Sequence, residues 1–193
     1  MTDVSTFTAF LGDQQVGSGV LPHVATALAG RDLGGAPVFI FDDATGRPVE
    51  LDLRHGPAAA VAEYERRTAP PPPQRPGRGR PRLGVVAREV TLLPRHWDWL
   101  AAQPGGASAT LRRLVDEARR DNIDVDQVRE TRDAAYRVMS ALAGDLPGFE
   151  DASRALFAGS YAGLAQVALG WPADVAAYVL RMAAPLSEAP VQG

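Results

Sequence analysis

The chain has 193 residues, of which 46% are hydrophobic, enough for one or two domains with cores of ordinary size. It contains no cysteine, which excludes disulfides, thiolate metal sites and cysteine nucleophiles. The formal net charge is −3, and no apolar run is long enough to cross a bilayer. The first residues lack the pattern of a signal peptide, so we expect a cytoplasmic protein without a membrane partner.

Residues 5–66 predict a small unit of the order β-β-α-β-β-α. Short runs of β-branched and aromatic residues indicate the strands, and apolar or small residues at helical spacing indicate the helices. In chain order the segments are FTAFLG, QVGSGVL, LPHVATALAG, PVFIF, PVELDL and AAAVAEYERR. The last two strands flank the turn DDATGR and therefore predict a hairpin.

Residues 68–83 form the predicted linker, which begins TAPPPPQRPGRGRPR. Residues 68–82 have no large apolar side chain, and their prolines remove backbone donors, so this run cannot pack as a core. Within it, Arg78-Gly79-Arg80-Pro81 resembles the core of an AT-hook, which orders in the narrow minor groove of AT-rich DNA. Arg75 and Arg82 would add positive charge beside it. A plain solvated linker is the alternative interpretation of the same residues.

Residues 84–122 predict a strand followed by two helices. GVVAREVTLL has the composition of a strand, PRHWDWLAAQ that of a first helix, and Ser108 is the predicted cap of a second helix. This order resembles ribbon-helix-helix DNA-binding proteins, whose paired strands enter the major groove. The resemblance implies an intertwined homodimer. It also implies that Gly106, Ala107 and Ser108 hold a backbone phosphate at the start of the second helix.

The predicted strand has two faces because its side chains alternate. One face carries Val86, Arg88, Val90 and Leu92, and the other carries Ala87, Glu89, Thr91 and Leu93. With Val90 and Leu92 in a core, Thr91 can contact a thymine methyl and Glu89 can accept a hydrogen bond from cytosine. Arg88 is a further candidate DNA contact. Few of these residues read bases well, which favours non-specific binding driven by arginine, and the alternative is a βαα unit that packs against neighbouring helices.

Two tryptophans stand close together in the first predicted helix of this segment. Trp97 shares a helical face with Leu100 and Ala101, so we expect it in the core. Trp99 points to a different face, where we expect an interface.

Residues 123–193 predict a helical bundle, divided by breaks at GDLPG, AGSYAG and GWPAD. The expected core residues are Val138, Leu142, Leu156, Phe157, Leu164, Val167, Val175 and Leu180. The sequence therefore predicts an α+β protein. Its predicted parts are an α/β domain at 1–67, the linker at 68–83, the ribbon-helix-helix-like segment at 84–122 and the helical region at 123–193.

Motifs for catalysis or cofactor binding are sparse. The three histidines are far apart, and no nucleophile elbow, phosphate loop or dinucleotide fingerprint is present. The predicted hairpin would bring together one possible set of metal ligands, Asp42, Asp43, Asp52 and His55. Carboxylates at hairpin turns are usually structural, so we predict no catalytic residue, no metal and no cofactor.

Several longer segments resemble one bacterial family, a domain of unknown function with the number 2239. They are FDDATGRPVELDLR, GRPRLGVVAREVTLLPRHWDWLAAQPGGAS, LRRLVDEAR and AYRVMSALAGDLPGFEDASRALFAG. The resemblance runs nearly from end to end. It implies no activity and brings no catalytic residues to this chain.

Charge is distributed unevenly along the chain. Residues 66–120 carry 12 arginines and 4 acidic residues, whereas the segments before and after them are acidic. A basic middle of this kind suggests a site for a polyanion. We therefore predict a DNA-binding homodimer, either a transcriptional regulator or a nucleoid-associated protein. The alternative is a non-enzymatic interaction scaffold, with a protein partner at the proline run and a basic partner at the acidic helical end.

Overall fold

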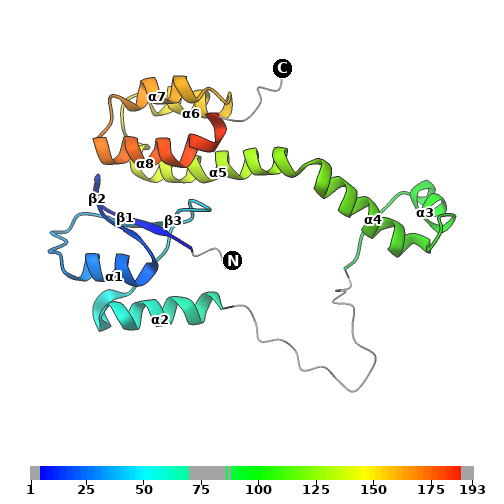
Figure 1. Cartoon of the computed structure of the whole chain (residues 1–193), viewed down its shortest axis with the longest axis horizontal. Helices are drawn as coiled ribbons and strands as arrows, with labels where there is room; N and C mark the ends of the chain where they lie inside the picture. Colours follow the sequence, from blue (N-terminus) through cyan, green and yellow to red (C-terminus); the bar gives the residue numbers. More distant parts are fainter. Residues whose placement is uncertain (1–4, 70–85, 87, 188–193) are drawn as a thin grey trace. The chain divides into compact units, whose positions relative to one another are not determined.

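The computed structural model describes residues 5–69, 86 and 88–187. The chain divides into two compact units. The first combines residues up to Ala69 with those from Val125 onward, and the second is the segment between them. Figure 1 shows the order of the elements along the chain. In the part of the chain that the structure describes, no helix is both long and apolar enough to cross a membrane.

A small antiparallel sheet lies at the centre of the first unit. Its strands are β1 (Phe7–Leu11), β2 (Gln14–Gly19) and β3 (Val38–Asp42), in the order β2-β1-β3. In the register of the sheet, Phe7 lies opposite Gly19 on one side and opposite Asp42 on the other. The central strand β1 is almost entirely buried, which agrees with its sequence FTAFL, apolar apart from Thr8.

The predicted hairpin after β3 is not formed as a strand pair. Beyond the turn, an isolated bridge joins Phe41 to Pro48, and the Val49 amide donates to the Ile40 carbonyl at 2.8 Å. The chain then leaves the sheet, because Asp52 accepts a hydrogen bond from the Arg54 amide and starts the 3-10 turn η1 (Leu53–His55). The observed order is therefore β-β-α-β-α, and the fourth strand of the prediction is wrong.

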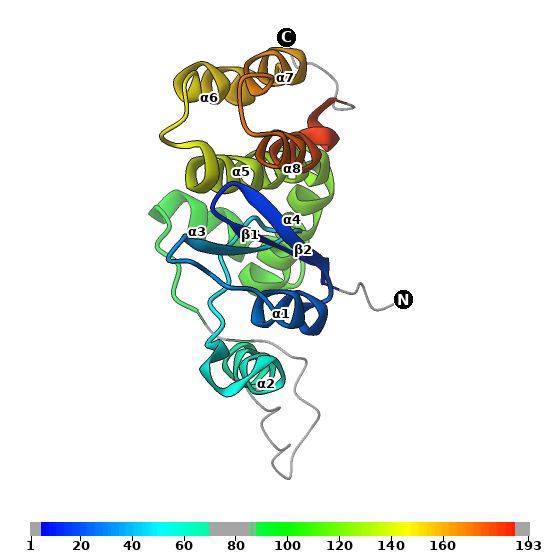
Figure 2. The same ribbon diagram turned by 90° about the vertical axis from the view of Figure 1, so that its left-hand side faces the viewer.

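Two helices cover one face of the sheet. They are α1 (Leu21–Ala29) and α2 (Pro57–Thr68), and each has a proline in its first turn, where the missing amide hydrogen costs nothing. Their apolar residues share a core with alternate residues of the strands. The helices contribute Val24, Leu28 and Val61, and the strands contribute Phe7, Ala9 and Ile40. Figure 2 shows α1 on one side of the strands and α8 on the other.

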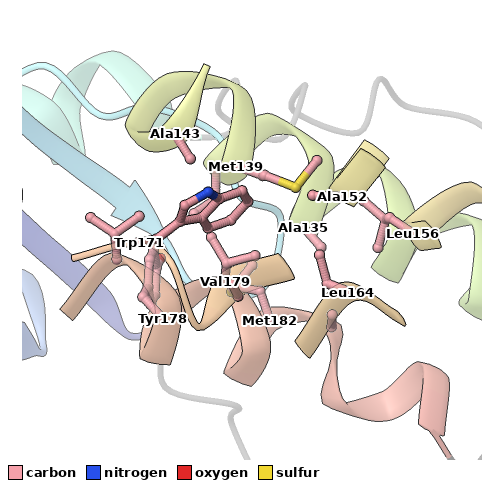
Figure 3. Close-up of a cluster of buried hydrophobic side chains, with 14 of the residues drawn as sticks. Ala135, Met139, Ala143, Ala152, Leu156, Leu164, Trp171, Tyr178, Val179 and Met182 are labelled. Carbon is pink, nitrogen blue, oxygen red and sulfur yellow. The ribbon is translucent and has the colours of Figure 1, made fainter. Parts of the chain in front are cut away.

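The opposite face of the sheet packs against the C-terminal helices. These are α5 (Ile123–Ala143), α6 (Phe149–Phe157), α7 (Tyr161–Ala168) and α8 (Ala173–Ala183), followed by the 3-10 turn η2 (Ala184–Ser187). Phe10 and Phe41 point from the sheet into the same core as Val138, Leu164 and Tyr178. Part of this core is drawn in Figure 3. The two ends of the chain therefore depend on each other for burial.

The helix breaks fall where Gly and Pro predict them. GDLPG separates α5 from α6, AGSYAG separates α6 from α7, and GWPAD separates α7 from α8. Of the expected core residues, Val138, Leu156, Leu164 and Val175 are buried. Phe157 is 49% exposed at the last position of α6, where its ring centroid lies 5.2 Å from that of Tyr136.

A tight turn carries the chain from β3 across the surface of α5. Gly46 has a left-handed φ of +64°, and a Cβ atom there would lie 2.3 Å from the carbonyl oxygen of Ala134. The Arg137 guanidinium donates to the Thr45 carbonyl at 2.8 Å. Only glycine combines this backbone conformation with so close an approach, so the residue type at position 46 is dictated by the packing.

A polar cluster joins the sheet to α8. The Thr8 hydroxyl and the Tyr178 hydroxyl both donate to Oδ1 of Asp43, at 2.8 and 2.9 Å. Arg181 donates to Thr8 Oγ1 at 3.1 Å and lies over the Tyr178 ring. Burial, and then the negative charge of Asp43, raise the pKa of Tyr178 above its ordinary value. The cluster satisfies polar groups that would otherwise be buried without partners.

Candidate nucleic-acid interface

Two helices joined by a short turn lie in the second unit, as the sequence predicts. They are α3 (Pro94–Ala101) and α4 (Gly106–Asp121). Gly105 and Gly106 have φ values of +84° and +74°, a conformation that turns the chain sharply between the helices. This turn makes Gly105 the N-cap, so α4 begins before Ser108, and the prediction that Ser108 caps the helix is wrong.

The predicted phosphate anchor lies in the first turn of α4. The Gly106 amide donates to the Gln103 carbonyl at 3.0 Å. Among the described residues, no acceptor receives the amide hydrogens of Ala107 and Ser108. Ser108 is exposed. Free amides at the positive end of a 16-residue helix provide the geometry that a phosphate oxygen requires.

The predicted strand before α3 is not formed within this single chain. Residue 86 and residues 88–93 belong to no strand, and Arg88, Glu89 and Thr91 are exposed. A strand forms only when a second strand pairs with it through a ladder of hydrogen bonds. Among the described residues of this unit there is no second strand that could pair with it. Among the described residues, no ion pair joins Arg88 or Glu89 to α4.

The arginines of the predicted linker 68–83 are the remaining candidate DNA contacts. Arg75, Arg78, Arg80 and Arg82 lie outside the described residues, as does the AT-hook-like tetrapeptide that contains two of them.

The helix pair leaves most of its apolar side chains uncovered. Within the described residues of this unit, only Leu100 and Thr110 are buried. An apolar hollow of about 260 Å³ opens between the helices, lined by Leu92, His96, Trp99, Leu100, Leu111 and Leu114. Leu111 and Leu114 lie three residues apart on α4, a helical spacing of apolar residues that is visible in the sequence, whereas His96 carries no such signal.

The tryptophans differ from the expectation in one respect. Trp99 is 50% exposed at the edge of the hollow, as suits an interface residue. Trp97 is also 41% exposed, so its predicted place in the core is wrong. An eight-residue helix that packs on a single neighbour buries one narrow side, and Leu100 occupies it.

Arginines line the outer surface of α4. Arg112, Arg113, Arg119 and Arg120 are all exposed. Arg113 forms an ion pair with Glu117 one turn away, at 2.9 Å. Arg119 and Arg120 lie in the last turn, where positive charge is favourable next to the negative end of the helix dipole. This surface can attract phosphates, and the pair at the helix end is free of ion-pair partners among the described residues.

The three aspartates of the possible metal-ligand set accept hydrogen bonds from residues of the chain. Asp42 Oδ1 accepts hydrogen bonds from the Ala44 and Thr45 amides, which closes the turn after β3. Hydrogen bonds from Arg54 lower the pKa of Asp52. In the described ranges, no three His, Asp or Glu residues lie close enough together to hold a metal ion.

These elements define an α+β protein that is mostly helical and contains a small antiparallel sheet. The chain belongs to a family described as an uncharacterized protein conserved in bacteria, domain of unknown function 2239, which it matches over residues 6–183. This match confirms the family resemblance of the sequence. No curated protein and no solved structure matches the chain. The ribbon-helix-helix and AT-hook resemblances therefore stay predictions.

Proposed function

We propose that this chain is a DNA-binding protein that acts as a homodimer through its second unit. The observation that carries the proposal is the uncovered apolar surface of α3 and α4, where only Leu100 and Thr110 are buried. A contiguous apolar surface of this kind is typical of an interaction site. A second copy offers the same surface, and a two-fold axis would pair the two segments before Pro94 as antiparallel strands.

In this dimer the candidate DNA contacts have separate roles. The first-turn amides of α4, at Ala107 and Ser108, would hold a backbone phosphate and set the position of the protein on the duplex. Thr91 and Glu89 would lie nearest the bases, with Arg88 beside them. Arg75, Arg78, Arg80 and Arg82 would contact phosphates or the minor groove. Binding that rests mainly on arginine is weakly specific and strongly dependent on salt.

The test is fluorescence anisotropy with AT-rich and GC-rich duplexes over a salt series. Each phosphate contact contributes roughly 0.9 to the slope of log affinity against log salt, so Arg78→Ala with Arg80→Ala should reduce the slope by about 2. Arg31→Ala with Arg54→Ala, in the first unit, is the control with the same change of charge and should leave the slope unchanged. Absence of binding at low salt would refute DNA binding, and equal slopes for the two double variants would refute phosphate contacts by Arg78 and Arg80.

A further inference from the structure

The first unit contains a pocket lined by both polar and apolar groups, and this unit is not the one proposed to bind DNA. It has a volume of about 460 Å³ and is the larger of two neighbouring hollows between the end of α2 and the extended segment after β3. Its size lies in the range of sites for small molecules. Arg47, Glu50, Tyr64 and Arg67 contribute to its walls, and Asp42 and Thr68 complete its polar lining.

Hydrogen bonds hold the walls of this pocket in place. The Arg67 guanidinium donates to the Glu50 carbonyl at 3.2 Å and lies 5.9 Å from the centre of the Tyr64 ring. The Tyr64 ring packs edge-on against the buried Phe7 ring, with centroids 6.2 Å apart. The Thr68 hydroxyl donates to the Tyr64 carbonyl at 2.8 Å. The aromatic wall is thus anchored in the core of the sheet, and the guanidinium is oriented against it.

Among the polar side chains that line the pocket, the two arginines still have N–H groups that can donate hydrogen bonds to a ligand. Asp42 Oδ1 already accepts hydrogen bonds from two amides and from the Thr45 hydroxyl. By contrast, neither Arg47 nor Arg67 forms an ion pair with any described carboxylate. Two guanidinium groups with free N–H donors and a neighbouring aromatic ring are complementary to an oxyanion attached to a planar group.

The neighbouring hollow has a different character. It measures about 250 Å³ and shares Glu50, Tyr64 and Arg67 with the first. Its own arginine, Arg54, is neutralised by Asp52 at 2.6 Å. Arg47 lines only the larger pocket, so two arginines without ion pairs to described carboxylates meet there, beside Asp42 and Glu50.

We propose that this pocket binds a small organic anion, a carboxylate or phosphate ester carrying a planar ring, through Arg47 and Arg67 with the ring against Tyr64. Glu50 is the one exposed carboxylate at the site without an ion pair among the described residues, and it opposes the ligand charge. Its presence limits the affinity. The proposal concerns the first unit and does not depend on DNA binding by the second.

The experiment is an NMR titration of the full chain with phenyl phosphate, with benzyl alcohol and benzylamine as the neutral and cationic probes. Phenyl phosphate should shift the amides of residues 45–50 and 64–68 and saturate with a dissociation constant on the order of 1 mM, as expected for so small a ligand. Benzylamine should not bind, and benzyl alcohol should bind much more weakly. No saturable shift with phenyl phosphate, or equal binding of all three probes, would overturn the proposal.

Charge variants decide whether the arginines are responsible. Arg47→Gln with Arg67→Gln should weaken phenyl phosphate binding about tenfold, because two charge-assisted hydrogen bonds are lost. Glu50→Gln should strengthen it about twofold, because a like charge is removed near an exposed site. Arg31→Gln with Arg119→Gln removes the same two charges outside the pocket lining and should have no effect. Equal affinity of the double variant and the wild type would show that the pocket is not an anion site. Unchanged thermal melts would show that the variants are folded.

Discussion

At the scale of single residues, Gly46 is the position where packing allows the least change. Gly46→Ala would place a Cβ atom 2.3 Å from the Ala134 carbonyl, so the turn after β3 would have to move away from α5. Gly12→Ala is the matched control, because Gly12 has a similar φ of +60° but no atom within 4 Å of the added Cβ. We expect Gly12→Ala to cost about 1–2 kcal/mol and Gly46→Ala at least about 3 kcal/mol of unfolding free energy in urea denaturation. Equal losses would contradict the close approach to α5.

Tyr178 gives the fold a specific dependence on alkaline pH. Because its pKa is raised in the folded state, the folded chain keeps the phenol proton at pH values where the unfolded chain, with a pKa of about 10, loses it. The folded state then binds more protons than the unfolded state, so the contribution is fully present below pH 10 and is lost as the pH rises above that value.

Denaturation between neutral pH and about pH 11 measures this effect, since the unfolded tyrosine titrates near pH 10. The unfolding free energy of the wild type should fall more steeply with pH than that of Tyr178→Phe. The phenylalanine variant should also lose about 1 kcal/mol at neutral pH, because its hydrogen bond to Asp43 is missing. Tyr161→Phe, outside this cluster, is the control and should keep the wild-type slope. If Tyr178→Phe also keeps that slope, the folded-state pKa of Tyr178 is not raised.

At the scale of elements, the exposed apolar side of α3 and α4 leads to a prediction about the oligomeric state. Trp99 borders the apolar hollow, so a carboxylate there would be buried without a partner in the proposed homodimer. We expect Trp99→Glu to be monomeric in analytical ultracentrifugation at concentrations where the wild type is dimeric. Leu169→Glu is the control, because Leu169 is 78% exposed after α7 in the first unit. A monomeric wild type, or a dimeric Trp99→Glu variant, would argue against this interface.

At the scale of the whole molecule, the first unit is assembled from the two ends of the chain. Phe10 and Phe41 are buried against the C-terminal helices, so residues 5–69 alone would expose both rings. We expect a fragment of residues 1–69 to give a poorly dispersed NMR spectrum, and a fragment of residues 125–193 to restore dispersion when added. A fragment of residues 70–124 should not restore it. A well-dispersed spectrum of residues 1–69 alone would show that the sheet folds without the C-terminal helices.

Features with a local cause follow from the amino-acid sequence by itself. The breaks between α5, α6, α7 and α8 come from Gly and Pro, which act through their own backbone geometry. The helix pair α3–α4 follows from the composition and spacing of apolar residues in its segment, and the interface expected at Trp99 stays a prediction. Thiol chemistry is excluded by composition alone, because the chain contains no cysteine.

Features that depend on partners distant in sequence are decided only by the tertiary structure. PVELDL alternates as a strand should, yet the hydrogen bonds of Asp52 turn the chain out of the sheet after a single bridge. Three further features join residues that are far apart along the chain or on different elements. They are the proposed anion-binding pocket, the Thr8–Asp43–Tyr178 cluster and the core that Phe10 shares with α8. The apolar sequence of β1 indicates two buried faces but not what covers them. That depends on which helices return to the sheet, and therefore on the packing of the whole unit.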